Sequence, residues 1–396
     1  MRVLLINDYG FINGGAEKHI VGLHAALEAC GDEVRIFTTN AGLDDPLRSS
    51  FADEACAGTL SSFRTLQQTA NPSAPAALER VLQRFQPDVA HLNLFLTQLS
   101  PLILRVLRGV PCVYQVHWQR PWCPTGKRLL PSGQVCAQQA GFPCYRNGCL
   151  PLRDWLPLMA QLRMLQSWRG AIDRFVAASR FMAERLRETG YVPVEMIRYA
   201  VSAQPARPRL CEPPMLLFAG RLDREKGCGL LLEAFQRVAA AVPAARLEIA
   251  GDGPEAGLLR ASAAALGIAE RVRFHGWLNA SELNALYARA WALAVPSIWE
   301  EPVGMVALEA ASFGTPAVVS GSGELAETVV DGETGLCVAL DCDDAAIRLA
   351  DACVRLLSDC GTNERMGEAA RARVRRVNSV EVMTREIRKL YTTVNS

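Results

Sequence analysis

Residues 296–315 read P-S-I-W-E-E-P-V-G-M-V-A-L-E-A-A-S-F-G-T, and this stretch decides how the rest of the chain is interpreted. The apolar run before it, residues 291–295, is typical of a buried strand, and from Met305 onward the residues favour a helix. Gly304 allows a tight turn between the two. The turn therefore presents free backbone N–H groups at a helix N-terminus, which is a site for an anion such as a diphosphate.

Two carboxylates flank this turn. Glu301 stands in the loop before the helix, and Glu309 lies inside the helix. Carboxylates are poor partners for phosphate but good hydrogen-bond acceptors for sugar hydroxyl groups. An anion site between two such acceptors fits a sugar nucleotide, and an acidic loop followed by a surface helix is the alternative interpretation.

Strands and helices alternate along the whole chain. In the first half, the predicted strands are 3–7, 33–38, 111–116, 174–178 and 197–200, with one more ending near Asn93, and the predicted helices are 16–29, 76–85, 99–108 and 152–168. In the second half, the strands are 215–219, 246–250, 271–275, 291–295 and 316–320, and the helices include 228–241, 281–289, 343–357 and 380–394. Such alternation predicts an α/β protein with parallel sheets covered by helices on both faces.

Residues 202–214 contain four prolines and show no periodicity, which is typical of a linker. They divide the chain into two predicted domains, residues 1–204 and 205–378. A final helix, residues 379–396, is expected to pack back on the first domain. The total of 396 residues suits two domains of ordinary size.

The composition excludes some classes of protein. The formal charge is +1, so we expect no nucleic-acid partner. The N-terminus becomes polar too early for a secretory signal, and no apolar run reaches membrane-spanning length. We expect a cytoplasmic protein. Peripheral contact with the inner face of a membrane stays open, because residues 152–168 combine Leu, Met and Trp with Arg; a helix that packs in the core is the favoured interpretation.

Candidate site residues also follow other predicted strands. Gly14 and Gly15 lie after the first strand and can bring backbone N–H groups close to a phosphate or sugar, although a plain turn would also use them. His117 directly follows strand 111–116, at the sheet edge where ligands bind. It can bond a substrate hydroxyl or act as an acid or base, or it can be structural, an interpretation that fits His91 better.

The segment G-R-L-D-R-E-K-G at 220–227 places two cations after a strand. Arg221 and Lys226 can clamp a diphosphate and stabilise it as a leaving group. A charged surface turn is the alternative.

The chain has 13 cysteines, and four of them lie in a turn-rich insertion at residues 120–150. Cys123, Cys136, Cys144 and Cys149 suit a structural Zn²⁺. An Fe–S cluster or four unligated thiols are the alternatives.

Taken together, these segments resemble the retaining glycosyltransferases of family 4, which have the GT-B fold. The matching pieces are G-G-A-E at 14–17, His117 after a strand, S-R-F at 179–181, A-G-R-L-D-R-E-K-G at 219–227, A-G-D-G-P at 250–254, F-H-G-W-L at 274–278 and the E-x7-E pattern formed by Glu301 and Glu309. The match covers nearly the whole chain, and its combined order is highly specific. It implies two Rossmann-like, doubly wound domains that face each other across a cleft.

The resemblance implies a transferase that moves a sugar from a UDP- or GDP-sugar to a saccharide or lipid-linked acceptor, as in polysaccharide biosynthesis, without a metal or other catalytic cofactor. Arg221 and Lys226 would bind the diphosphate, Glu301 the donor sugar and Glu309 the ribose, while His117 would contact the sugar near the reacting carbon. The remaining donor contacts would come from Gly14, Gly15, Glu17, Gly276, Trp277, Leu278, Gly304, Met305 and Val306.

Two positions depart from the family pattern. Trp118 follows His117 where the family often has Asp, and residues 323–327 read G-E-L-A-E, of which only Glu327 matches the family's final acidic residue. Two other functions remain as alternatives, namely a nucleotide-sugar epimerase on the same fold and a zinc-dependent interaction module.

Overall fold

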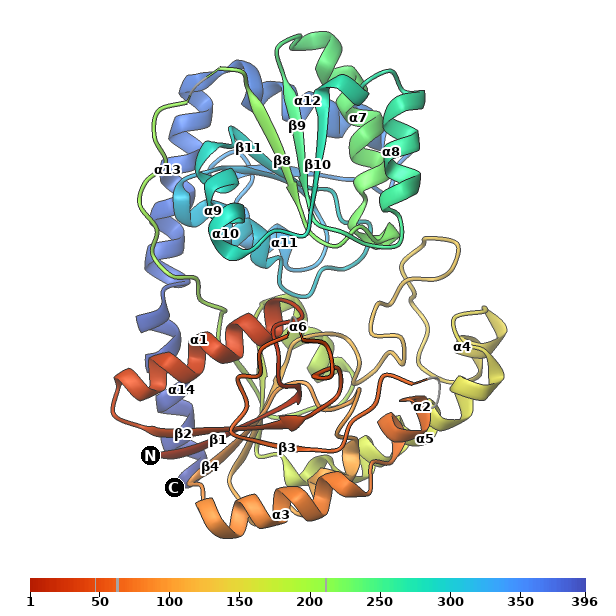
Figure 1. The fold of residues 1–396 in the computed structure, drawn as a ribbon, viewed down its shortest axis with the longest axis vertical. Coiled ribbons are helices and arrows are strands. Elements are labelled where there is room, and N and C mark those ends of the chain that lie inside the picture. The colour runs from red at the N-terminus through yellow and green to blue at the C-terminus, as the bar shows by residue number, and fades with distance from the viewer. Residues whose placement is uncertain (47, 62–63, 211) are drawn as a thin grey trace. The chain divides into compact units, whose positions relative to one another are not determined.

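A computed structural model describes residues 1–46, 48–61, 64–210 and 212–396, and its fold is drawn in Figure 1. Contacts divide the chain into two compact units. Unit 1 comprises Met1–Ala200 together with Val380–Ser396, and unit 2 comprises Val201–Ser379. Each unit is built on a parallel β-sheet with helices packed against it, so the predicted α/β class is confirmed.

Within the described residues, unit 1 has a seven-stranded sheet in the order β3-β2-β1-β4-β5-β6-β7. The strands are β1 (Arg2–Tyr9), β2 (Glu33–Thr39), β3 (Glu54–Cys56), β4 (Val89–Leu92), β5 (Cys112–Val116), β6 (Arg174–Ala177) and β7 (Val194–Met196). Every residue of β4 and β5 is buried. Central strands of a parallel sheet are covered on both faces, which is why these two strands show no alternation of polar and apolar residues in the sequence.

The helices of unit 1 are α1 (Gly15–Ala29), α2 (Arg64–Thr69), α3 (Ser73–Phe85), α4 (Phe142–Arg146), α5 (Leu152–Trp168), α6 (Arg180–Glu188) and α14 (Val380–Asn395), with 3-10 turns η1 (Pro101–Arg105) and η2 (Arg169–Ala171). The final helix α14 packs against α1, β4 and β5. Its Met383, Ile387 and Tyr391 share a hydrophobic core with Ile20 and Leu23 of α1. The end of the chain is therefore part of unit 1.

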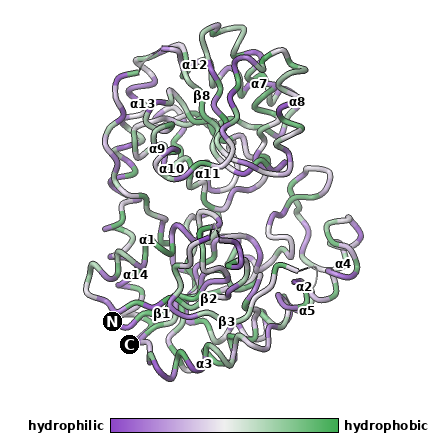
Figure 2. Tube along the Cα trace, viewed as in Figure 1, coloured by the Kyte–Doolittle hydropathy of each residue, from purple (hydrophilic) through white to green (hydrophobic). Residues whose placement is uncertain are grey.

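Unit 2 has, among the described residues, a six-stranded sheet in the order β10-β9-β8-β11-β12-β13. The strands are β8 (Met215–Ala219), β9 (Arg246–Ala250), β10 (Val272–Gly276), β11 (Ala292–Val295), β12 (Ala317–Ser320) and β13 (Gly335–Val338). The helices are α7 (Cys228–Ala241), α8 (Ala256–Ala265), α9 (Ala280–Arg289), α10 (Met305–Phe313), α11 (Leu325–Thr328), α12 (Ala345–Ser358) and α13 (Cys360–Val377), with 3-10 turns η3 (Arg224–Lys226) and η4 (Ala269–Arg271). The apolar run of the central strand β8 can be followed in Figure 2.

Both sheets have a topological switch point, where the strand order reverses. It lies between β1 and β4 in unit 1 and between β8 and β11 in unit 2. Open α/β sheets bind ligands in the crevice at the carboxyl ends of the strands beside such a point. In unit 2, the loops that leave β8 and β11 carry Lys226 and Glu301, so the topology brings these two segments together.

The predicted linker at 202–214 lies on unit 2, apart from residue 211, which is outside the described residues. The backbone N–H of Arg207 donates to the carbonyl of Phe313 at 2.8 Å, and its guanidinium donates to the carbonyls of Ala290 and Trp291 at 3.1 and 3.2 Å. These bonds tie the segment to unit 2, and the boundary between the units falls at Ala200.

Two predicted elements are wrong. The helix expected at 99–108 is only the 3-10 turn η1, because Ser100 has a φ of 68° and the N–H of Leu99 bonds the Asp8 carboxylate instead of starting a helix. The strand expected at 197–200 is instead β7, Val194–Met196, which pairs with β6. The apolar residues that suggested the later position, Ile197 and Tyr199, are buried outside the strand.

In the described part of the chain, no helix has both the length and the apolar character needed to span a membrane.

Candidate functional site

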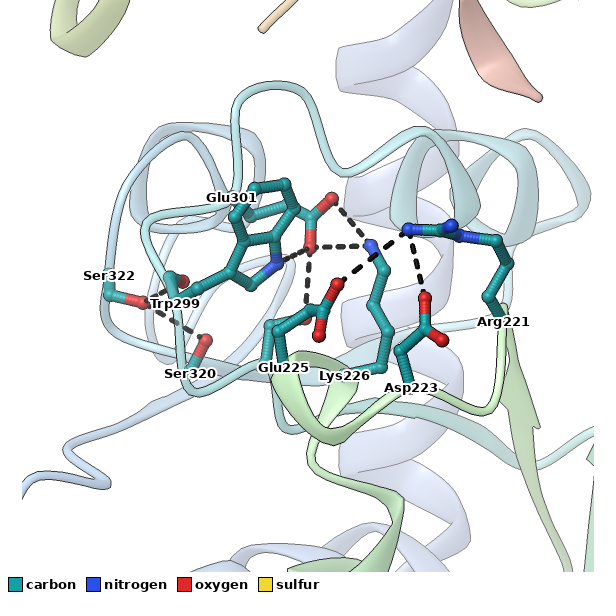
Figure 3. Close-up of polar contacts among 9 residues, drawn as sticks. Arg221, Asp223, Glu225, Lys226, Trp299, Glu301, Ser320 and Ser322 are labelled. Atoms are coloured by element: carbon teal, nitrogen blue, oxygen red, sulfur yellow. Dashed lines mark hydrogen bonds and ion pairs between the residues drawn. The ribbon is translucent and has the colours of Figure 1, made fainter. Parts of the chain in front are cut away.

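Lys226 and Glu301 form an ion pair at the switch point of unit 2 (Figure 3). The Lys226 ammonium donates to both carboxylate oxygens of Glu301, at 2.8 and 2.9 Å. The same carboxylate accepts hydrogen bonds from the hydroxyl of Ser297 and the indole N–H of Trp299, both at 2.9 Å. Four donor contacts therefore fix the orientation of Glu301.

Glycine 227 explains how the two loops come so close. Gly227 has a φ of 71°, and a Cβ at this position would lie 1.9 Å from the carbonyl oxygen of Pro296. Any side chain would separate the loop after β8 from the loop after β11. Beside it, the N–H of Ile298 donates to the carbonyl of Glu225 at 2.9 Å and joins the same loops. Both contacts set Lys226 opposite Glu301.

Arg221 lies in the same loop as Lys226 and is held differently. Its guanidinium is 3.0 Å from the Asp223 carboxylate and 3.7 Å from that of Glu225, and its side chain is 66% exposed. Guanidinium has five N–H donors, so these contacts leave most of its donors directed elsewhere. The loop after β8 thus offers one anchored ammonium and one exposed guanidinium.

Helix α10 begins directly after the loop that carries Glu301. Gly304 is its N-cap, with a φ of 64°, and Met305 and Val306 are its first two residues. The first N–H groups of a helix have no acceptor within that helix. The first turn of α10 has no acidic residue, so its N-terminus keeps the positive end of the helix dipole.

Glu309 is placed farther along α10, where its carboxylate accepts a hydrogen bond from the buried Tyr287 hydroxyl at 2.8 Å. Burial, together with the charge of Glu309, raises the pKa of Tyr287 well above its ordinary value. Tyr287 therefore stays a proton donor and orients Glu309. The Tyr287 hydroxyl thus helps to position Glu309, whereas Glu301 is held by Lys226, Ser297 and Trp299.

The remaining predicted positions of unit 2 follow β10 and β12. Gly276 ends β10 with a φ of 72°, and Trp277 is 76% exposed. Leu278 is half-buried beside the core that includes Tyr287. In the divergent segment 323–327, the backbone N–H of Glu324 donates to the carbonyl of Glu301 at 2.9 Å. This bond ties the segment to the loop that carries Glu301.

Gly14, Gly15 and Glu17 lie at the N-terminus of α1 in unit 1. Gly14 is the N-cap and Gly15 the first helical residue. Glu17 is only 3% exposed, and its carboxylate is hydrogen-bonded by Asn7 and by the backbone N–H groups of Gly14 and Glu17. Burial raises the pKa of Glu17 despite these bonds. The start of α1 is thus already covered by a carboxylate of the chain itself.

His117 lies in unit 1 at the end of β5 and is almost fully buried. Its Nε2 is 2.9 Å from Oδ1 of Asn93, and its Nδ1 is hydrogen-bonded with the Tyr199 hydroxyl. The amide of Asn93 is itself oriented, because its Nδ2 donates to the carbonyl of His91 at 3.2 Å. Asn93 Oδ1 can only accept, so Nε2 of His117 carries the proton and Nδ1 accepts from Tyr199.

Two further buried histidines adjoin His117. His19 stacks on Tyr199, with ring centroids 4.3 Å apart, and its Nε2 is 3.0 Å from Oε1 of Gln115. Burial lowers the pKa of His19 to about 4 and that of His91 to about 3, and it lowers the pKa of His117 well below its ordinary value. All three rings are therefore neutral at physiological pH.

The sequence did not identify the side chains that hold these residues in place. Ser297, Trp299, Asn93, Tyr199 and Tyr287 each bond a predicted site residue. Ser297 and Trp299 lie within four residues of Glu301, so a search for polar neighbours of each candidate would have found them. Asn93 and Tyr199 are 24 and 82 residues from His117, and the sequence alone carries no signal for those contacts.

The four cysteines of the insertion are free, partly buried thiols. Burial raises the pKa of Cys144 and Cys149, and the nearby Cys123 and Cys136 raise both further. The four thiols therefore lie within electrostatic reach of one another. Across residues 1–46, 48–61, 64–210 and 212–396, however, no three Cys, His, Asp or Glu side chains are grouped as a metal site requires. Metal binding here stays a prediction.

Comparison with known proteins identifies the family. A family model described as "Glycosyl transferases group 1" matches residues 204–373, and one described as "Glycosyl transferase 4-like domain" matches residues 14–200. An alpha-maltose-1-phosphate synthase of Mycobacterium tuberculosis is 33% identical over 299 residues, which cover 72% of this chain and 73% of that protein.

Solved structures share the fold. A sucrose-phosphate synthase from Thermosynechococcus elongatus has a TM-score of 0.77 at 22% identity, covering 99% of this chain and 98% of the other. Anabaena HepE, solved with UDP and glucose, has a TM-score of 0.72 at 17% identity, covering 99% and 100%. The predicted GT-B fold is confirmed, and the chain belongs to the family-4-like glycosyltransferases, as an enzyme of that class.

Proposed function

We propose that this glycosyltransferase moves a sugar from a UDP- or GDP-sugar to a saccharide or lipid-linked saccharide acceptor, with retention of configuration at the anomeric carbon. The observation that carries the proposal is the Lys226–Glu301 pair at the switch point of unit 2, directly before the N-terminus of α10. The presence of UDP and glucose in the Anabaena HepE structure supports a nucleotide-sugar donor.

The ion pair can bind both the diphosphate and the sugar of such a donor. An ammonium group has three N–H donors, and two of those of Lys226 point at Glu301. The third is available to a phosphate oxygen, so Lys226 bridges the diphosphate and Glu301. The carboxylate oxygens of Glu301 retain lone pairs for sugar hydroxyls, and Arg221 and the N–H groups of Met305 and Val306 complete the anion site.

The reaction needs no protein nucleophile in this proposal. The bond between the anomeric carbon and the diphosphate oxygen breaks, and the electron pair leaves with the diphosphate. The acceptor hydroxyl forms its bond on the same face, and its proton passes to the departing phosphate. Lys226, Arg221 and the α10 terminus stabilise the charge that develops on the leaving group.

The donor is tested by thermal unfolding of the protein with UDP-, GDP- and ADP-sugars. A ligand at 100 times its dissociation constant stabilises the folded state by about 2.7 kcal/mol, which raises Tm measurably. We expect a rise with a UDP- or GDP-sugar that disappears in Lys226→Ala. Stabilisation of equal size in that variant would show that the pair is not the donor site.

Retention is tested on the product. NMR of the anomeric proton should show the same configuration in donor and product, and mass spectrometry should find no glycosyl group on Glu301 or Glu309. A trapped covalent adduct on either carboxylate would refute the mechanism. A nucleotide-sugar epimerase is the second candidate, because it needs the same donor site. Incubating enzyme and donor without acceptor distinguishes the two, since only an epimerase would change the sugar.

The proposal includes a structural metal ion at Cys123, Cys136, Cys144 and Cys149. Four thiolates match the tetrahedral preference of Zn²⁺, and the backbone N–H of Arg128 donates to Sγ of Cys123 at 3.4 Å, a bond that favours a thiolate. We expect about one zinc per chain by elemental analysis of the purified protein. Cys144→Ser should lose the metal, whereas Cys30→Ser, at an exposed thiol of α1's end, should keep it. Wild-type protein without zinc or iron would contradict this assignment.

We further place the enzyme in the cytoplasm, in peripheral contact with a membrane that carries its acceptor. The exposed residues of α4 and α5 support the membrane contact. Their charge also suggests which lipids the membrane contains.

A further inference from the structure

Helix α4 and the first turns of α5 carry a group of exposed apolar side chains. Phe142 and Tyr145 of α4 are 60% and 41% exposed, and Leu152 and Leu156 of α5 are 51% and 58% exposed. Leu152 and Leu156 are four residues apart, so they lie on one face of α5. Helix α4 lies at the outer edge of unit 1 (Figure 1). These four residues, with the three arginines named below, are called the α4–α5 surface.

The surface is preformed because α4 is fastened to α5. The Trp155 ring lies between the helices, with its centroid 6.4 Å from that of Phe142 and 6.2 Å from that of Tyr145. Its indole N–H donates to the carbonyl of Gly141 at 2.8 Å. The opposite face of α5 is buried and carries its own apolar residues, Leu158, Leu162 and Leu165. The core of unit 1 therefore does not need the exposed ones.

The same part of the chain is strongly basic. Residues 120–169 contain seven Arg and Lys residues and one acidic residue, a formal charge of +6, whereas the whole chain carries +1. The formal charges of all other residues therefore sum to −5. Arg146, Arg153 and Arg163 are exposed on or beside the α4–α5 surface. Arg153 pairs with Asp154 at 3.5 Å, and within the described part of the chain neither Arg146 nor Arg163 meets a carboxylate.

We infer that the α4–α5 surface binds the anionic face of a lipid bilayer. Its apolar side chains enter the interfacial region, where aromatic rings are favoured, and its arginines meet lipid phosphates. A nucleic acid would use the arginines but leave Leu152 and Leu156 in water. An apolar protein groove would use the leucines but not the charge. An anionic membrane uses both. This inference rests on the membrane contact proposed above, and its test does not depend on the donor site.

The test is flotation of the full-length protein with vesicles of phosphatidylcholine, with and without phosphatidylglycerol. We expect binding only to the anionic vesicles, with a loss at high salt because exposed charges are screened. Each arginine near an anionic surface changes the partition coefficient about fivefold, so Arg146→Glu/Arg163→Glu should lower it by about 25-fold or more. Phe142→Gln/Leu156→Gln should lower it about tenfold.

Matched controls are Leu258→Gln, at a residue of unit 2 that is 65% exposed, and Arg80→Glu, at an exposed residue of α3. Both should bind like the wild type, and all variants should keep its thermal unfolding curve. The inference is overturned if anionic vesicles do not bind the wild type or bind the surface variants equally well. It is also overturned if the wild type instead binds an RNA oligonucleotide, or forms a concentration-dependent dimer, and the surface variants abolish that binding or that dimer.

Discussion

The carboxyl ends of the two sheets hold their polar side chains in different ways. In unit 1, His117, Asn93 and Tyr199 are bonded to one another in a buried group without a net charge. In unit 2, Lys226 and Glu301 are a charged pair whose side chains are 21% and 11% exposed, and Arg221 beside them is largely exposed. The first arrangement fixes positions, and the second keeps charges within reach of a ligand.

The two helix N-termini show the same difference. The start of α1 is covered by the carboxylate of Glu17, which its own N–H groups bond. The start of α10 has no acidic residue in its first turn and lies beside the loop that carries Glu301, which Lys226 balances. At α1 the carboxyl group of Glu17 already occupies the N–H groups that a phosphate would need, whereas a phosphate approaching α10 would meet cations. This contrast favours the proposed assignment of the diphosphate to the N-terminus of α10 in unit 2.

Removing the ammonium group of Lys226 is expected to have the largest effect. Lys226→Ala deletes the cation proposed to stabilise the leaving diphosphate, and it leaves Glu301 with an uncompensated charge. We expect kcat to fall by about 10²–10³-fold, the range for losing one preorganised charge stabiliser. Steady-state kinetics with the donor found by the thermal panel would measure it.

Two variants control this experiment. Lys389→Ala removes an exposed lysine of α14 and should have wild-type kinetics. Lys226→Arg keeps the charge but not the compact ammonium, and it should recover only part of the activity. A Lys226→Ala enzyme with wild-type kcat would show that unit 2 holds its charges for stability and not for catalysis.

Lowering the pH tests whether the buried histidine rings of unit 1 are neutral in the folded protein. The pKa of His19 is lowered by burial from its ordinary 6.5 to about 4, so the unfolded chain binds a proton that the folded chain does not over that interval. Stability conferred by the neutral ring is therefore complete above pH 6.5 and is lost as the pH falls toward 4. His19 alone lowers the free energy of unfolding by about 3 kcal/mol as the pH falls across that interval.

The measurement is urea unfolding between pH 7 and pH 5, compared with His19→Gln. The variant should lose less stability on acidification than the wild type does. Asp8 and Glu17, whose pKa values are raised by burial, act in the opposite direction, but they are the same in both proteins and cancel in the difference. His24→Gln is the control, because His24 is partly exposed on the same helix. A His19→Gln slope equal to the wild-type slope would mean that the ring is protonated in the folded state.

The sequence predicted the fold well where a strand is central and apolar. The buried strands β1, β4, β5, β8 and β11 were all located, because short runs of mostly apolar residues mark them locally. Short edge strands such as β3, Glu54–Cys56, and β7, Val194–Met196, were missed or misplaced, since solvent on one side removes the apolar signal.

In the candidate site, too, some features were predicted from the sequence and others were not. Lys226 and Glu301 were predicted individually from loops that follow strands, and the parallel topology then brings their loops together. That they bond each other in the structure was not predicted, because it depends on Gly227 fitting against Pro296. The network around His117 is built from residues far apart in sequence, so only the folded sheet reveals it.

The finest test of the comparison concerns how Glu301 is oriented. Trp299→Phe removes the indole N–H that donates to Glu301 at 2.9 Å but keeps an aromatic ring under the Lys226 ammonium, which lies 5.2 Å from the ring centroid. One hydrogen bond to a charged group is worth about 1.5 kcal/mol, so kcat/KM should fall about tenfold. Trp299→Leu also removes the cation–π contact and should cost a further few-fold. If both variants lose the same activity, the hydrogen bond and not the aromatic ring positions the pair. Wild-type kinetics in Trp299→Phe would mean that Lys226 and Ser297 suffice to orient Glu301, and the charged pair of unit 2 would then be less dependent on its surroundings than the histidine network of unit 1.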